Sequence, residues 1–268
     1  MRIGFLANIS AHFATSWPGV LTAIEQEGHQ VYLAAGDAGN IEGKWEVNKL
    51  DGVTRKPSFY SVKALRSIRS WVSANRIDVV VTNTATPSAL SRIALLGRTP
   101  VVYFAHGLHW GANDGVSSIP WKLVEYSLSF ASVGVVVLNS EDEAFFRMHR
   151  RKLPVLRLPY GLGVDSKLYP RAAVPMSYGG GRLRLLWVGE FIDRKRPIDA
   201  LLAMEWIRSK GYDAHLTMCG NGPLLSNVRA EIAQRGLSEY VAMPGVVPIL
   251  NFYSDSNVLI HTARWEGL

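Results

Sequence analysis

The 268-residue sequence contains a single cysteine, Cys219, so no disulfide can form within the chain. So little cysteine suits a reducing cytoplasm. No apolar run approaches the roughly 18 residues of a membrane-spanning helix, and the run at 133–138 is far too short. The first ten residues lack the basic and then apolar segments of a signal peptide. These absences predict a cytoplasmic protein that is at most peripheral at the inner face of the plasma membrane.

Acidic residues are also in the minority, with 22 Asp and Glu against 29 Lys and Arg, which gives a net charge of +7. The basic residues are scattered and no DNA- or RNA-binding signature is present, so we do not expect a nucleic-acid partner. Attraction to anionic lipid headgroups or to diphosphate substrates fits this charge better. An ordinary basic surface remains an equally good interpretation.

Two fingerprints of other enzyme classes are missing. The loop after the first expected strand has no G-x-G-x-x-G sequence, which disfavours a dinucleotide-dependent oxidoreductase. No G-x-S-x-G sequence occurs either, and Cys219 has no evident catalytic partner, so hydrolase chemistry is disfavoured.

What the sequence does contain is a regular alternation of short apolar runs and helical patterns, which predicts an α/β protein with parallel sheets. In the first half the expected strands are 2–7, 30–35, 79–82, 101–105, 133–138 and 154–158, and the expected helices are 16–27, 61–75, 87–96, 120–130 and 140–150. In the second half the expected strands are 183–188, 215–219, 240–243 and 257–261, and the expected helices are 197–209 and 224–235. At 140–143 the letters SEDE predict a helix capped by Ser140, with three acids in its first turn.

A stretch rich in Pro, Ser and Gly at 172–181 has no periodicity and predicts a linker. It divides the chain into an N-terminal domain at 1–171 and a C-terminal domain at 182–268. We expect two Rossmann-like, doubly wound domains that face a cleft. The second is expected to be incomplete, because it offers about four strands where a full unit has around six. We therefore expect the chain to be truncated at Leu268.

Three polar groups in the second half follow strand-like runs, where open α/β sheets bind ligands. The first is Gly189 followed by Arg194-Lys195-Arg196, which can present cations and backbone N–H groups to a phosphate at a helix N-terminus. The second is Gly220-Asn221-Gly222-Pro223, where the glycines permit close backbone approach and the proline suits a helix start. A solvated basic loop and an ordinary βα turn are the alternatives.

The third group is Glu266-Gly267-Leu268, which follows the expected buried strand at 257–261. A carboxylate at a strand end can accept hydrogen bonds from two sugar hydroxyls while the glycine N–H approaches the same ligand. The alternative is a capping residue for a following helix. The three groups in this order resemble the donor-sugar half of a nucleotide-sugar glycosyltransferase.

In the first half, His106 and His109 follow the expected strand at 101–105. The segment has no acidic helix beside it, so we expect no metal site there. His106 is expected to donate a hydrogen bond to a substrate hydroxyl, with a buried packing histidine as the alternative. Other polar residues at strand ends are assigned to contacts with the acceptor: Ser10, His12, Asn83, Thr84, His109 and Asn139.

With these residues in place, the sequence resembles the retaining GT-B glycosyltransferases of the large "group 1" family, family four. It resembles more narrowly the bacterial enzymes of capsule, exopolysaccharide and lipid-linked oligosaccharide assembly. The resemblance rests on His106-Gly107-Leu108-His109, Trp121, Glu125, Leu138-Asn139-Ser140-Glu141-Asp142, Gly161-Leu162-Gly163-Val164-Asp165, Val188-Gly189-Glu190, Lys195, Gly220-Asn221-Gly222-Pro223 and Glu266-Gly267-Leu268.

The resemblance implies a UDP-sugar donor and a glycan or polyprenyl-diphosphate-linked acceptor, and transfer with retention of anomeric configuration. Lys195, with Arg194, would neutralise the donor diphosphate without a metal or other cofactor, and Glu266 would hold donor-sugar hydroxyls. His106 would lie near the transferred sugar. Glu190 stands where the family often has arginine, which places more of the phosphate binding on Lys195. A UDP-sugar epimerase of the same fold and a non-catalytic remnant are the alternatives.

Overall fold

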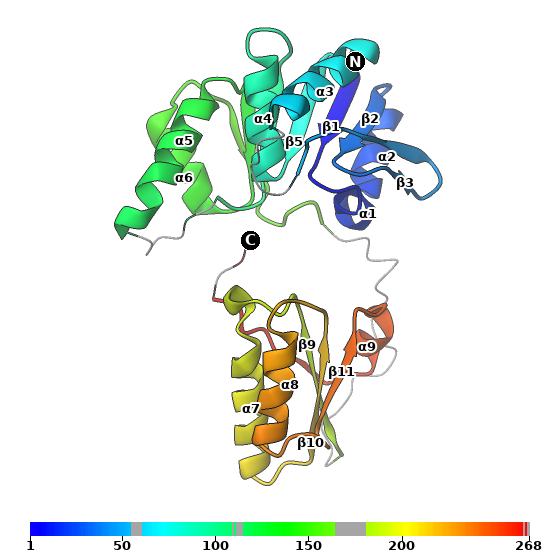
Figure 1. Cartoon of the computed structure of the whole chain (residues 1–268), viewed down its shortest axis with the longest axis vertical. Helices are drawn as coiled ribbons and strands as arrows, with labels where there is room; N and C mark the ends of the chain where they lie inside the picture. Colours follow the sequence, from blue (N-terminus) through cyan, green and yellow to red (C-terminus); the bar gives the residue numbers. More distant parts are fainter. Residues whose placement is uncertain (55–60, 109, 111–114, 164–180, 265, 267–268) are drawn as a thin grey trace. The chain divides into compact units, whose positions relative to one another are not determined.

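The computed structural model describes residues 1–54, 61–108, 110, 115–163, 181–264 and 266. The chain divides into two compact units, Met1–Asp165 and Ser166–Glu266. Each unit is a β-sheet flanked by helices (Figure 1). Residues 172–180 of the expected linker lie outside the described residues.

The first unit is built on an eight-stranded sheet of order β3-β4-β2-β1-β5-β6-β7-β8. Its strands are β1 (Arg2–Leu6), β2 (Gln30–Ala35), β3 (Gly39–Ile41), β4 (Trp45–Lys49), β5 (Val79–Asn83), β6 (Val101–Ala105), β7 (Gly134–Val137) and β8 (Val155–Arg157). Its helices are α1 (His12–Ser16), α2 (Pro18–Gln26), α3 (Ser61–Ala74), α4 (Ala85–Leu95), the 3₁₀ turn η1 (Gly115–Ser118), α5 (Ile119–Ser129) and α6 (Ser140–His149). All neighbouring strands are parallel except β3 and β4.

This sheet is covered on both faces, as its nearly continuous apolar strands predict. Leu6 and Val80 pack on one face among side chains of α3 and α4, including Ile68. Phe5 and Phe104 pack on the other face among side chains of α1 and α2. The doubly wound α/β architecture expected from the sequence is therefore confirmed.

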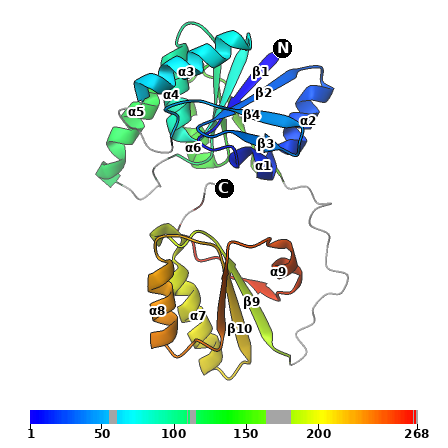
Figure 2. The ribbon, with the colours of Figure 1, turned by 45° about the vertical axis from the view of Figure 1, so that its right-hand side comes forward.

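The β3–β4 ribbon was not expected from the sequence. It lies beyond β2, near α2 (Figure 2). Trp45 and Val47 are buried whereas Glu46 between them is exposed, which is the alternation of a strand with one solvated face. Trp45 Nε1 also donates to Glu25 Oε1 at 2.9 Å, which fastens the ribbon to α2. The pattern is too short and too polar to be recognised without these tertiary contacts.

The second unit has a four-stranded, all-parallel sheet of order β11-β10-β9-β12. Its strands are β9 (Leu183–Val188), β10 (Ala214–Cys219), β11 (Val241–Gly245) and β12 (Val258–Leu259). Its helices are the 3₁₀ turn η2 (Asp193–Lys195), α7 (Pro197–Ser209), α8 (Leu225–Gln234) and α9 (Leu250–Ser254). Trp187, Met204 and Val228 from β9, α7 and α8 share one buried core.

One expectation for this unit is wrong. The strand predicted to be buried at 257–261 is reduced to β12, in which Val258 and Leu259 pair with β9. These two side chains are 44% and 52% exposed. The strand lies at the edge of the sheet, and apolar residues in an edge strand are not necessarily buried. No helix in the described part of the chain has the length and apolar character needed to span a membrane.

Candidate functional site

The carboxyl ends of β1, β5 and β6 lie side by side, because these strands are neighbours in one parallel sheet. His12 begins α1 after β1, Asn83 ends β5, and His106 directly follows β6. The rings of His12 and His106 are 4.9 Å apart, edge to face. His106 Nε2 lies 3.2 Å from Asn83 Oδ1. The structure thus brings His106, which is expected near the transferred sugar, together with His12 and Asn83, which the sequence assigns to the acceptor side. With Thr84 we call these residues the histidine cluster.

The histidine cluster holds several buried polar atoms that have no hydrogen-bond partner among the described residues. They are His12 Nε2, Asn83 Nδ2 and Thr84 Oγ1. Thr84 also has a φ of +69°, in a region that costs a non-glycine residue energy. Buried polar groups in native proteins are nearly always bonded to protein or water. The cluster therefore has donors and acceptors available for a ligand.

Both imidazoles of the cluster are uncharged near neutral pH. Burial lowers the pKa of His106 to about 4, and repulsion from the neighbouring His12 contributes in the same direction. Burial also lowers the pKa of His12. A neutral imidazole can donate one hydrogen bond and accept another but adds no positive charge. These histidines are suited to orienting hydroxyl groups.

The loop after β6 is held by the start of α6. Leu108 N donates to Asp142 Oδ2 at 3.1 Å. Asp142 N in turn donates to Asn139 Oδ1 at 2.8 Å, which makes Asn139 the N-cap of α6. The cap expected at Ser140 is therefore wrong, because the backbone is extended at Asn139 and already helical at the serine. Asn139 thus has a capping role beside the loop that carries His106.

Two candidates for the acceptor side remain, Ser10 and His109. Ser10 donates through its backbone N and its Oγ to the two carboxylate oxygens of Asp37, at 2.6 and 2.9 Å. It therefore ties the loop after β1 to the loop after β2. His109 lies outside the described residues.

In the second unit, the residues expected to bind phosphate and sugar meet. Arg194 Nη1 lies 2.7 Å from Glu266 Oε2, and Lys195 Nζ is paired with Oε1 of the same carboxylate. His261 Nε2 lies 3.2 Å from that oxygen. We call Arg194, Lys195, His261 and Glu266 the cation–carboxylate cluster. The sequence indicated three of its four members but not His261, which it placed within a strand.

The cation–carboxylate cluster is charged and reachable from solvent. Burial alone would raise the pKa of Glu266, but hydrogen bonds from Lys195 and Arg194 outweigh it and hold the pKa below its usual range. The side chains of Arg194, Lys195 and Glu266 are 29%, 19% and 29% exposed. Two cations against one carboxylate leave the cluster positive, which favours an anionic ligand.

Backbone and hydroxyl contacts fix this cluster in place. Thr262 Oγ1 donates to Lys195 O at 2.8 Å and accepts from Trp187 Nε1 at 2.9 Å. Arg264 N donates to Arg194 O at 2.8 Å. The third cation of the loop, Arg196, instead pairs with Asp199 in the first turn of α7, at 2.7 Å. Nothing in the sequence distinguishes Thr262 from any other threonine near a strand end.

The glycine turn after β10 packs directly on the loop after β9. A Cβ at Gly220, whose φ is +140°, would lie 1.9 Å from Gly189 O. A Cβ at Gly222 would lie 2.6 Å from both N and O of Phe191. Phe191 N also donates to Asn221 O at 2.9 Å. Only glycine allows this approach, so two of the three expected donor-binding segments lie against each other.

The other donor-side candidates need less description. Pro223 lies in the turn just before α8, two residues short of the helix start. Gly267 and Leu268 lie outside the described residues. Within the described ranges, no group of three or more His, Cys, Asp or Glu side chains could hold a metal ion.

Comparison with known proteins covers both units. The model of Glycosyltransferase Family 4 matches residues 20–154, and that of glycosyl transferases group 1 matches residues 179–268. No protein of curated function has a significantly similar sequence.

Similar solved structures cover the whole chain. Sucrose-phosphate synthase from Thermosynechococcus elongatus is 16% identical, with a TM-score of 0.78 over 100% of this chain and 77% of that one. HepE from Anabaena in complex with UDP and glucose is 15% identical, with a TM-score of 0.74 over 100% and 76%. The lipopolysaccharide outer core galactosyltransferase WaaB is 12% identical, with a TM-score of 0.65 over 100% and 76%.

At such low identities these structures establish a shared fold, the GT-B fold of parallel-sheet Rossmann-like domains. The family assignment rests on the sequence match, which spans half of the chain in the first unit alone. The chain therefore belongs to Glycosyltransferase Family 4, with a group 1 glycosyltransferase region in its second unit.

Proposed function

We propose that this protein transfers a sugar from a UDP-sugar to a glycan or lipid-linked glycan in bacterial surface polysaccharide synthesis, with retention of anomeric configuration. The observation that carries the proposal is the meeting of Arg194 and Lys195 with Glu266. Phosphate-binding and hydroxyl-binding groups side by side match the two ends of a sugar diphosphate. The related HepE structures, which contain UDP with glucose or UDP-glucose, support the choice of donor.

On the donor side, Lys195 and Arg194 bind the diphosphate and stabilise the charge that develops on the leaving UDP. Glu266 accepts hydrogen bonds from hydroxyls of the donor sugar. The loops that carry Gly189 and the sequence Gly220-Asn221-Gly222-Pro223 line the nucleotide site. Gly267 and Leu268 complete the proposed set next to the glutamate.

On the acceptor side, His106 donates a hydrogen bond to a hydroxyl of the transferred sugar. Positive charge develops at the anomeric carbon as the bond to UDP breaks, and a neutral imidazole does not oppose that charge. Its low pKa, about 4, therefore suits this role. The unpartnered polar atoms of His12, Asn83 and Thr84 are proposed to bind acceptor hydroxyls.

We further propose that no metal takes part, because the side chains of Lys195 and Arg194 supply the positive charge that a divalent cation would otherwise bring. The acceptor hydroxyl attacks the anomeric carbon from the face that UDP leaves. The C–O bond to UDP breaks with its electron pair going to the phosphate oxygen, and the proton of the hydroxyl passes to the departing diphosphate. Bond making and breaking on one face retain the configuration.

The experiment is a transfer assay with labelled UDP-sugars, a polyprenyl-diphosphate-linked N-acetylglucosamine acceptor and excess chelator. The anomeric configuration of the product is read by NMR. We expect an α-linked product from an α-linked donor, lost in Lys195→Ala and kept in Arg196→Ala, whose side chain pairs with Asp199 instead. A β-linked product would contradict retention. Epimerised sugar released without acceptor would point instead to an epimerase of the same fold.

A further inference from the structure

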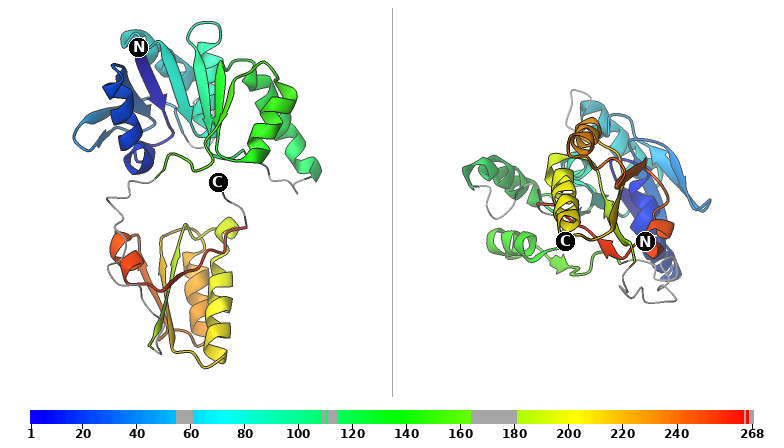
Figure 3. Two further views of the ribbon diagram at one scale, coloured as in Figure 1. Left: turned by 180° about the vertical axis from the view of Figure 1, so that it is seen from behind. Right: turned by 90° about the horizontal axis from the view of Figure 1, so that it is seen from below.

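Asn83 is a buried amide at the carboxyl end of β5, in the middle of the first sheet. The strands β1, β5 and β6 run side by side there (Figure 3). Asn83 is 0% exposed, and its Oδ1 lies 3.2 Å from His106 Nε2. Its Nδ2 is also buried and has no hydrogen-bond partner among the described residues. Asparagine is mostly a surface residue, and a buried one normally has its polar atoms paired. The contact with His106 is therefore the feature to explain.

The imidazole of His106 is restrained on the other side of this contact. The ring of Phe104 lies 4.6 Å from it between centres, with the two planes inclined by 30°. The ring of His12 meets it edge to face at 4.9 Å. Among the described residues only Nε2 of its two ring nitrogens has a hydrogen-bond partner, and His106 is half-buried. Nδ1 is therefore the nitrogen that remains for a ligand.

The contact with Asn83 decides which ring nitrogen of His106 carries the proton. Burial lowers the pKa of His106 to about 4, so near neutral pH the ring has one N–H group and one lone pair. If Asn83 Oδ1 faces Nε2, then Nε2 donates and Nδ1 keeps the lone pair. If the amide turns by 180° about its Cβ–Cγ bond, Nδ2 donates to Nε2 and the proton of the ring lies on Nδ1.

The burial of Asn83 favours the second arrangement. With Oδ1 toward the ring, both N–H groups of Nδ2 lack an acceptor among the described residues. With Nδ2 toward the ring, one of them gains an acceptor and a carbonyl oxygen is left over instead. Among buried backbone groups, unpaired N–H donors are rarer than under-used carbonyl oxygens, and the same balance applies to a side-chain amide.

We propose that Asn83 is a positioning residue that donates a hydrogen bond from Nδ2 to His106 Nε2 and thereby holds the proton of the imidazole on Nδ1. The proposal rests on the proposed function, in which His106 donates a hydrogen bond to a hydroxyl of the transferred sugar. The donor of that bond is then Nδ1–H. Asn83 Oδ1 and the second hydrogen of Nδ2 remain for an acceptor hydroxyl.

The test is long-range ¹H–¹⁵N NMR of the full chain labelled with ¹⁵N-histidine, at about pH 8, above the ordinary pKa of histidine. The chemical shift of a ring nitrogen differs widely between an N–H group and a bare nitrogen. The chain has seven histidines, and the pattern lost in His106→Gln identifies that of His106. We expect a protonated Nδ1 and a bare Nε2 in the wild type. A protonated Nε2 with a bare Nδ1 would overturn the proposal.

Two variants of Asn83 test whether this residue sets the tautomer. A carboxylate only accepts hydrogen bonds, so Asn83→Asp should move the proton to Nε2. Asn83→Leu adds no buried charge, removes both hydrogen-bonding groups and should give a mixture of tautomers. The matched control is Asn75→Asp, which adds the same charge near the amino end of β5, where Asn75 Nδ2 donates to Trp71 O. It should leave the His106 shifts unchanged. Wild-type shifts for His106 in Asn83→Leu would overturn the role of Asn83.

Sugar transfer gives a second measurement. In Asn83→Leu, kcat should fall about tenfold while KM for the UDP-sugar changes little, because one hydrogen bond to the transferred sugar is weakened. The two failures can be told apart. The Nδ1–H tautomer in a protein without transfer activity would contradict the proposed function and support the role of Asn83. Transfer by a protein whose His106 is protonated on Nε2 would do the opposite.

Discussion

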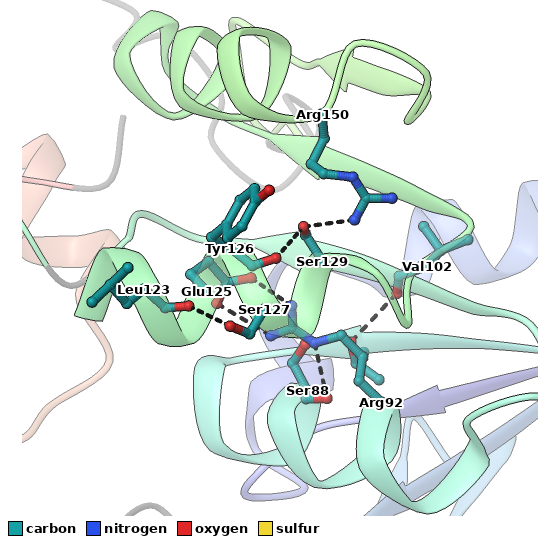
Figure 4. Close-up of polar contacts among 10 residues, drawn as sticks. Ser88, Arg92, Val102, Leu123, Glu125, Tyr126, Ser127, Ser129 and Arg150 are labelled. Carbon is teal, nitrogen blue, oxygen red and sulfur yellow. Dashed lines mark hydrogen bonds and ion pairs between the residues drawn. The ribbon is translucent and has the colours of Figure 1, made fainter. Parts of the chain in front are cut away.

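Replacing Glu125 with glutamine is expected to destabilise the first unit by about 3–5 kcal/mol. The guanidinium of Arg92 is fully buried and contacts both oxygens of the Glu125 carboxylate, whose side chain is only 10% exposed (Figure 4). Glutamine is nearly the same size but carries no charge, so the buried cation loses its compensation. Since whole domains are stable by about 5–15 kcal/mol, this single change removes a large part of the total.

The measurement is urea unfolding followed by far-UV circular dichroism. Glu143→Gln is the matched control, because Glu143 pairs at 2.9 Å with Arg147 and Arg157, which are 60% and 43% exposed. Such surface pairs contribute about 0–1 kcal/mol. A double variant, Arg92→Met with Glu125→Leu, should recover most of the loss, since neither apolar side chain needs a counter-ion. A loss below about 1 kcal/mol in Glu125→Gln would show that the Arg92–Glu125 pair does not hold α5 in place.

Three further predictions concern the two sites. Glu266→Gln should raise the affinity for UDP without a sugar, because Arg194 and Lys195 lose their carboxylate partner and can bind the phosphates. Unchanged or weaker UDP binding in calorimetry would contradict the proposed site. The free energy of unfolding should fall as the pH drops from 6.5 to about 4, because the unfolded chain takes up protons that His106 and His12 exclude when folded. Replacing both histidines with asparagine should flatten this pH dependence in thermal melts. An unchanged pH dependence would contradict the low pKa values of His106 and His12. Gly220→Ala should lower the free energy of unfolding by more than about 2 kcal/mol. In Gly211→Ala the added methyl group would contact no other atom, so only backbone strain should be lost. Equal losses for the two variants in urea unfolding would be inconsistent with close packing at Gly220.

Much of the secondary structure follows from local pattern. The apolar runs of β1 and β9 and the polar–apolar rhythm of α7 are visible without tertiary information, and the structure places these elements within a residue of the expected positions. The short ribbon at Gly39–Lys49 was missed because its burial depends on contacts with α2. Capping by Asn139 rather than Ser140 depends on one backbone conformation that either residue could adopt.

The candidate sites were predictable only in part. The pairing of Lys195 with Glu266 could be expected because each follows a strand, and parallel strands bring their carboxyl ends together. The edge-to-face contact of His12 with His106 depends on two loop conformations that no spacing in the sequence encodes. The direction of α5 was equally hidden, since it is set by an arginine on another helix, Arg92, which the pattern of α5 itself does not show.

We propose that this chain binds a UDP-sugar through the cation–carboxylate cluster. A thermal-shift panel with UDP, UDP-GlcNAc, UDP-Gal, UDP-Glc and GDP-mannose tests it directly, because a ligand that binds only the native state raises the melting temperature. We expect a selective shift with a uridine sugar that is lost in Lys195→Ala and kept in Arg196→Ala. No shift with any nucleotide, or an equal shift in Lys195→Ala, would contradict it.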